Sequence, residues 1–327
     1  MIMKYGILSK DIWTIIIKFL PENFWKNIKR LNSHFEKLIK SDLMIKNMSF
    51  DDLCKKGYIE SLLSFIKNTR TGDKKQNWNK GLYYACVGRH KEIVDLMMFN
   101  GADNFRYGLQ GACTGGHLKI VKLMISKLNL SEDEYLNYPL RLACVSGNIK
   151  IVQLLISKGA DDWNNGLEGA CFRGNFEILD LMISKGANNW NDGLIQGCFG
   201  GQKEIVNLMI SKGANNWNEA LESICDGLIT IYNAEWNKYI EILDLIISSG
   251  ANNFNEVFPK VCSSGIIDLV NYMILKGANK WNWGIDTACR NFHEKSSENI
   301  NKIIDLMILK GANYCDNCDN HKHPSLH

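Results

Sequence analysis

The chain lacks the features that mark several large protein classes. Lysine and arginine exceed aspartate and glutamate by only three in 327 residues, so charge gives no reason to expect a nucleic-acid or membrane-surface partner. No apolar run is long enough to span a bilayer. The apolar stretch 12–20 is short, contains Lys18 and has no small-residue cleavage site, which argues against a signal peptide. These absences predict a soluble protein of a reducing compartment, the cytoplasm being expected and the nucleus not excluded.

Catalytic motifs are missing as well. The sequence has no Gly-rich phosphate loop followed by Lys and Ser or Thr, no H-E-x-x-H and no G-x-S-x-G elbow. Its carboxylates recur at equivalent positions along the chain and form no distinctive pair. We therefore expect no enzymatic activity, no catalytic residue and no cofactor.

Cysteine, in contrast, is abundant and regularly spaced. Nine of the eleven cysteines follow one another at intervals of 27 to 37 residues, most often 27. They are Cys54, Cys86, Cys113, Cys144, Cys171, Cys198, Cys225, Cys262 and Cys289. Thiols repeated so evenly do not suit a disulfide framework. Since free cysteine behaves as a small apolar side chain, the pattern predicts one buried position in each of nine repeats.

Other residue types keep the same register. In the unit around Cys171, an apolar Leu167 lies four residues before the cysteine, a small Ala170 one before, and Gly174 three after. A longer apolar segment follows and ends at Gly186, the residue after a lysine, which is a helix-stop signal. Each unit therefore predicts a short helix, a glycine turn and a longer helix. Because neither helix can bury its apolar face alone, successive pairs are expected to stack into a solenoid.

The segment from Tyr138 to Asp161 resembles the ankyrin repeat. It reads Y-P-L-R-L-A-C-V-S-G-N, then I-V-Q-L-L, then K-G-A-D, beside the family pattern T-P-L-H-x-A-A-x-x-G, E-I-V-x-L-L and G-A-D. The resemblance extends from about residue 50 to 314 in some nine units. It implies an all-α, ankyrin-type helical-repeat solenoid that binds other proteins and does not catalyse.

Most units depart from the family in length. They have 27 residues instead of 33, and the loss falls where ankyrin repeats carry a β-turn finger. An aromatic residue stands eight positions before most of the cysteines, and it either closes the resulting gap by packing or forms an exposed binding ridge. These aromatics are Trp78, Phe105, Trp163, Trp190, Trp217, Phe254 and Trp281. Insertions around 229–239 and 294–301 are expected to be loops.

Residues 1–48 do not follow the repeat. Their helical spacing of apolar residues resembles an F-box, a family that docks to a Skp-type adaptor of cullin ubiquitin ligases. The resemblance implies that Leu8, Ile12, Ile16 and Leu20 form the docking surface, although Ser9 stands where the family usually has proline. The alternative is a helical hairpin that only caps the first repeat. An F-box before ankyrin repeats resembles ankyrin proteins of giant DNA viruses.

The tail, residues 315–327, contains a small group of potential metal ligands. Cys315, Cys318, His321 and His323 are residue types that suit Zn²⁺. A single C-x-x-C with nearby histidines is a weak signal, however, since the second ligand pair normally follows a longer loop. A disordered tail without a metal is the preferred interpretation.

The resemblance to ankyrin repeats places partner binding on the short helices of the concave face. We compared the positions six and three residues before each cysteine. Early units carry Lys80, Tyr83, Tyr107, Gln110, Tyr138 and Arg141; later units carry Glu168, Asp192, Glu219, Glu222, Glu256 and Asp286. The acidic later half is expected either to bind a basic or mixed-charge protein segment or to be merely a solvated face. Its charge also argues against nucleic acid.

Together these patterns predict three parts and a binding function. The parts are an F-box-like segment at 1–48, ankyrin repeats at 49–314 and the tail at 315–327. The preferred function is a monomeric, substrate-recruiting adaptor that joins a target protein to a Skp-type adaptor, in host cytoplasm if the source is a virus. The alternative is a plain ankyrin scaffold or decoy, capped by residues 1–48. The sequence does not name the target.

Overall fold

The chain is helical throughout the part that can be described. A computed structural model describes residues 48–69, 77–128, 133–230, 236–292 and 298–313. Within these ranges there are 18 α-helices, labelled α3 to α20, one short 3-10 helix, η1 (Asp133–Leu136), and no strand. The all-α prediction is thereby confirmed for the described residues. The F-box-like segment, apart from residue 48, and the tail lie outside them.

The helices follow one another in pairs, and the chain divides into two compact units after Gly108. The first unit contains α3 (Phe50–Lys56), α4 (Ile59–Thr69), α5 (Trp78–Gly88), α6 (Lys91–Phe99) and the start of α7 (Phe105–Thr114). The second continues with α8 (Leu118–Lys127), α9 (Asn137–Ser146), α10 (Ile149–Ser157), α11 (Trp163–Arg173), α12 (Phe176–Ser184), α13 (Trp190–Phe199), α14 (Lys203–Ser211), α15 (Trp217–Thr230), α16 (Trp236–Ser248), α17 (Phe254–Ser263), α18 (Ile267–Leu275), α19 (Trp281–Phe292) and α20 (Glu298–Leu309).

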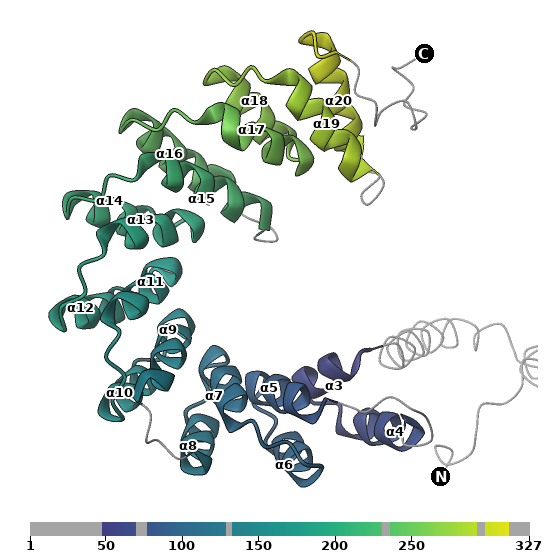
Figure 1. Cartoon of the computed structure of the whole chain (residues 1–327), viewed down its shortest axis with the longest axis vertical. Helices are drawn as coiled ribbons and strands as arrows, with labels where there is room; N and C mark the ends of the chain where they lie inside the picture. Colours follow the sequence, from purple (N-terminus) through teal and green to yellow (C-terminus); the bar gives the residue numbers. More distant parts are fainter. Residues whose placement is uncertain (1–47, 70–76, 129–132, 231–235, 293–297, 314–327) are drawn as a thin grey trace, which may run out of the picture. The chain divides into compact units, whose positions relative to one another are not determined.

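In the second unit, the first helix of each pair lies beside the first helices of its neighbours. Figure 1 shows α11, α13, α15, α17 and α19 along one side of this stack, with α12, α14, α16, α18 and α20 along the other. Each repeat cysteine of this unit lies on a first helix. The helices on either side of it in the stack are the first helices of the preceding and following pairs. The stacked arrangement of pairs predicted from the sequence is therefore seen in this unit.

Local signals begin and end these helices. The side chain of Asn175 accepts a hydrogen bond from the Ile178 N–H at 3.0 Å and so caps the start of α12. Gly186, with φ of 110°, ends the same helix, and the next N–H, that of Ala187, donates to the Met182 carbonyl at 3.0 Å. A left-handed residue is required there, and glycine adopts that conformation without steric cost.

The repeat cysteines are core residues, as predicted. Eight of them, from Cys54 to Cys262, are free thiols with no exposed surface. Cys289 is also buried, at 2% exposure, but it is disulfide-bonded and so departs from the expectation of free thiols at every copy. The regular spacing predicted burial correctly because one helix position faces the neighbouring pair in every unit.

In several helix pairs a glycine of the first helix faces a methionine of the second. Gly193 lies five residues before Cys198, and a Cβ added to it would come within 2.6 Å of the Met209 sulfur and 2.9 Å of Leu167. Met209 is fully buried, so it fills the space that the glycine leaves. The recurrence of glycine in one helix and methionine in the next is thus a packing pair.

The two insertions are not simply loops, so that prediction was wrong at their edges. Helix α15 extends to Thr230 and α16 begins at Trp236, while α20 begins at Glu298. Tyr239 is buried, and its hydroxyl donates to the Phe199 carbonyl at 2.8 Å. Tyr239 is thus buried against the preceding repeat, which makes helix more stable than loop at that edge of the first insertion.

Candidate protein-binding surface

Three positions of each first helix share one stripe. They stand six and three residues before the repeat cysteine and one residue after it, and this spacing places them on a single side of a helix. We call this stripe in α9 to α19 the first-helix face. Its members are Tyr138, Arg141, Val145, Asn165, Glu168, Phe172, Asp192, Ile195, Phe199, Glu219, Glu222, Asp226, Glu256, Pro259, Ser263, Trp283, Asp286 and Arg290.

In the first unit three of the predicted binding residues, Lys80, Tyr83 and Tyr107, belong to one group of contacting side chains. The Lys80 ammonium lies 2.5 Å from an Asp51 carboxylate oxygen and 5.9 Å from the centre of the Tyr84 ring. Tyr83 and Tyr107 stack with ring centres 4.4 Å apart and planes at 17°. Burial, followed by the neighbouring Tyr83, raises the pKa of the Tyr107 hydroxyl. The structure therefore brings Lys80, Tyr83 and Tyr107 together, but Asp51 neutralises the lysine.

A second pair of predicted residues meets on α9 and α11. The Arg141 guanidinium lies 3.3 Å from a Glu168 carboxylate oxygen, and both side chains are partly buried. Burial raises the pKa of the Glu168 carboxyl despite the opposing effect of Arg141, and the nearby Asp192 raises it further. This part of the first-helix face is therefore electrically balanced, because the early basic residue and the later acidic residue compensate each other.

Three of the predicted acids are held by neutral amides. Asp192 accepts a hydrogen bond from the side chain of Asn189, the residue that caps α13. Glu219 accepts from Asn216 at 3.1 Å, and Glu222 accepts from Asn253 at 2.8 Å. These amides fix the carboxylates without cancelling their charge.

Glu256 completes a group of four uncompensated acids. It is exposed, on α17. Within the described ranges, none of Asp192, Glu219, Glu222 and Glu256 forms an ion pair with a lysine, arginine or histidine. By contrast, Asp286 pairs with Arg290 at 2.5 Å, and Asp226 pairs with Lys260. The predicted acids that have no ion-pair partner therefore lie on three helices, α13, α15 and α17.

The aromatics eight positions before the cysteines are all partly buried. Trp78 contacts Phe50, and Trp281 contacts Phe258, in both cases edge to face. Trp163 and Trp190 instead lie beneath lysine ammonium groups, those of Lys185 and Lys212, at 5.9 and 5.7 Å from the ring centres. These residues act in packing, yet they are not a continuous stack of aromatic rings.

An asparagine seven positions before most of the repeat cysteines has a structural role that the sequence pattern did not single out. The Asn191 side-chain oxygen accepts hydrogen bonds from the backbone N–H groups of Asn215 and Asn216, at 2.8 and 3.2 Å, in the next repeat. Equivalent bonds are made by Asn79, Asn137, Asn164, Asn218, Asn255 and Asn282. We call these residues the asparagine clamp. The repeated Trp-Asn pair was the available signal.

The asparagine clamp takes the place of the missing finger, because it fixes the linker between repeats. We expect Asn191→Ala to lower the free energy of unfolding by about 1–2 kcal/mol, since it leaves two linker N–H groups without their acceptor. Urea denaturation followed by circular dichroism measures this change. Asn191→Asp, which keeps an acceptor oxygen, should lose much less stability. Equal stability of the alanine variant and the wild type would contradict the clamp.

Trp283, at 55% exposure, is a further member of the first-helix face that the sequence pattern did not single out. It stands six residues before Cys289, so continuing the compared position by one unit would have found it.

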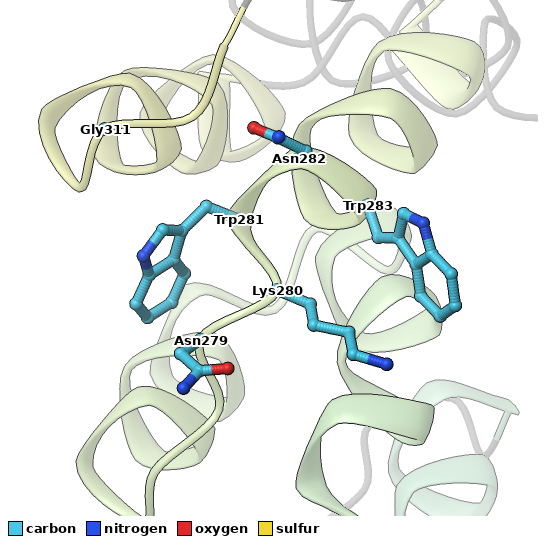
Figure 2. Close-up of a pocket in the computed structure, with 6 residues that line it drawn as sticks. All are labelled: Asn279, Lys280, Trp281, Asn282, Trp283 and Gly311. Carbon is cyan, nitrogen blue, oxygen red and sulfur yellow. The ribbon is translucent and has the colours of Figure 1, made fainter.

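A pocket of about 370 Å³ is lined by Asn279, Lys280, Trp281, Asn282, Trp283 and Gly311. Figure 2 shows the two indoles on opposite sides of the start of α19, with the Lys280 side chain extending toward Trp283. The Lys280 ammonium lies 4.4 Å from the Trp283 ring centre.

The remaining predicted residues cannot be placed. Leu8, Ile12, Ile16 and Leu20, and the tail group Cys315, Cys318, His321 and His323, lie outside the described residues. Among the residues that are described, no group of three or more histidine, cysteine or carboxylate side chains could hold a metal ion. No helix in those ranges has the length and apolar character needed to cross a membrane.

Comparison with known proteins gives one family. Residues 82–165 match a family model described as ankyrin repeats, in three copies. No curated protein matches the chain. The matched segment begins within α5 and ends at the start of α11. The same alternation of first and second helices continues beyond it through α20. The chain therefore carries ankyrin repeats, which are typically non-enzymatic and imply a module for protein–protein interaction.

Proposed function

We propose that this chain is a non-enzymatic adaptor that captures a target protein and joins it to a Skp-type adaptor of a cullin ubiquitin ligase. The repeats would hold the target, and residues 1–48 would engage the ligase, with Leu8, Ile12, Ile16 and Leu20 at the contact. Two things support the proposal: the ankyrin repeats and the F-box-like spacing of apolar residues at the start of the chain.

The observation that carries the capture role is the first-helix face. It has partly exposed apolar side chains and carboxylates that are fixed by hydrogen bonds to neutral amides. Side chains that are already oriented lose less conformational entropy when a partner binds. A face of this kind suits recognition of a protein segment, because it combines apolar area with polar groups of fixed geometry.

The ligase role is tested by pull-down of the purified full-length chain with a Skp-type adaptor. We expect binding by the wild type and loss of binding when residues 1–48 are deleted. Ile12→Glu should weaken binding at least tenfold, since a buried charge at an apolar contact costs more than about 1.4 kcal/mol. Asn27→Glu adds the same charge in the same segment but outside residues 8–20, which hold the four contact positions, so it serves as the matched control.

The two outcomes separate the ligase adaptor from a scaffold. Binding that is lost with Ile12→Glu and kept with Asn27→Glu supports docking through the predicted apolar positions. No binding by the full-length chain would contradict the ligase role. The protein would then be an ankyrin scaffold or decoy in which residues 1–48 only cap the repeats.

A further inference from the structure

An apolar patch lies in the middle of the first-helix face. Phe172 on α11 and Phe199 on α13 bring their rings to a centroid distance of 5.7 Å. Ile195 stands one helical turn before Phe199 on the same stripe. All three side chains are partly exposed. The patch therefore leaves part of its apolar surface accessible to solvent.

The charges around this patch are one-sided. On the side of α9, Arg141 and Glu168 compensate each other at 3.3 Å. On the other side lie Asp192, Glu219 and Glu222, whose hydrogen-bond partners are neutral asparagine amides. Glu256 on α17 extends the negative charge by one more repeat. The face thus changes from balanced to uncompensated negative charge at α13.

We propose that this face is the docking site of a protein segment in which bulky apolar residues are followed by lysines or arginines. The apolar residues would cover Phe172, Ile195 and Phe199, and the basic residues would lie over α15 and α17. The inference rests on the proposed capture role and deepens it by naming the chemical class of the partner. Charge complementarity identifies a basic occupant, and the apolar patch requires one that also has apolar side chains.

The proposal is tested by fluorescence anisotropy on the full-length chain. The probe is a labelled synthetic peptide with leucines at one end and arginines at the other. One companion peptide carries glutamates in place of the arginines, and another carries serines in place of the leucines. We expect the first peptide to bind, both companions to bind at least about tenfold more weakly, and the affinity to fall as salt is added.

Matched variants locate the binding on the protein. Glu219→Gln combined with Glu222→Gln should weaken binding about fivefold, since each exposed charge pair contributes modestly. The control removes the same charge from exposed positions of second helices, Glu177→Gln with Glu204→Gln, and should bind like the wild type. Ile195→Ala should weaken binding by loss of apolar contact, with circular dichroism confirming that the helices persist.

Two results would overturn the inference. One is equal binding of the arginine and glutamate peptides, and the other is equal loss of affinity in the face variant and its control. If the full-length chain does not bind the Skp-type adaptor but selects the arginine peptide, the ligase role is contradicted and the docking site is supported. If the chain binds the Skp-type adaptor but does not distinguish the peptides, the ligase role is supported and the docking site is contradicted.

Discussion

The helices of this protein are expected to unfold cooperatively as the pH rises above about 9, well before the buried thiols reach their pKa in the folded state. Burial raises the pKa of Cys86, Cys144, Cys171 and Cys225 from 9.0 to about 12. Cys54 behaves likewise, with a smaller contribution from Asp51. Burial also raises the pKa values of Cys113, Cys198 and Cys262.

The sign of the effect follows from proton binding. Above pH 9 the unfolded chain loses thiol protons that the folded chain retains up to about 12, so the unfolded state binds fewer protons. Each thiol therefore lowers the free energy of unfolding by about 1.4 kcal/mol per pH unit in that interval. A typical domain is stable by only about 5–15 kcal/mol, so several thiols acting together exhaust that margin within roughly one or two pH units.

Two signals recorded in one alkaline titration check this prediction. Thiolate absorbance in the ultraviolet should appear together with the loss of helical circular dichroism. Cys171→Ala should be less stable at neutral pH, but its deficit should shrink by about 1.4 kcal/mol per pH unit above 9, because one titrating thiol has been removed. Thiolate absorbance that rises while the helices remain intact would show that the thiols ionise in the folded protein.

Two glycines in neighbouring first helices are expected to respond differently to substitution by alanine. A Cβ added at Gly169 in α11 would lie 2.5 Å from the Arg141 carbonyl oxygen and 3.2 Å from the Val145 nitrogen, which are backbone atoms of α9. Gly169→Ala should therefore lower the free energy of unfolding by about 1–3 kcal/mol, because the two helices must move apart.

The second glycine provides the matched control. The two atoms nearest to a Cβ at Gly197 in α13 would be side-chain methyl groups of Ile205 and Val206, at 3.2 and 3.4 Å. Alanine stands at the equivalent position of several other units, and alanine favours helix over glycine by about 1 kcal/mol. Gly197→Ala should be neutral or stabilising in urea denaturation. If both variants lose similar stability, close backbone approach is not the reason for glycine at 169.

Periodicity predicted the parts of this protein that repeat. The cysteine spacing located the core position, and the glycine stops located the helix ends, since both depend on signals within one unit. It failed where the period is interrupted. Tyr239 and the end of α15 belong to helices because they bury against the preceding repeat, which no local turn signal reports.

The candidate site was predicted only in outline. The compared positions did lie on one side of the first helices, because spacings of three and four residues share a helix face. Trp283 stands at one of the compared positions, six residues before Cys289, so the same comparison could have included it. The asparagine clamp was missed because its bonds join an asparagine to a linker 24 or 25 residues later in most units.

The sequence by itself determined that this protein is a series of helix pairs with buried cysteines. It also determined that one stripe of each first helix, the first-helix face, carries the side chains that vary between repeats. Those features follow from hydrophobic spacing within single helices. Only the tertiary structure decided which acids on that stripe are paired with a basic side chain. Glu168 is compensated by Arg141 of the preceding repeat, whereas Glu219 and Glu222 are held by neutral amides. Such pairing depends on distances of a few ångströms between side chains of different helices, which the order of residues along the chain does not supply.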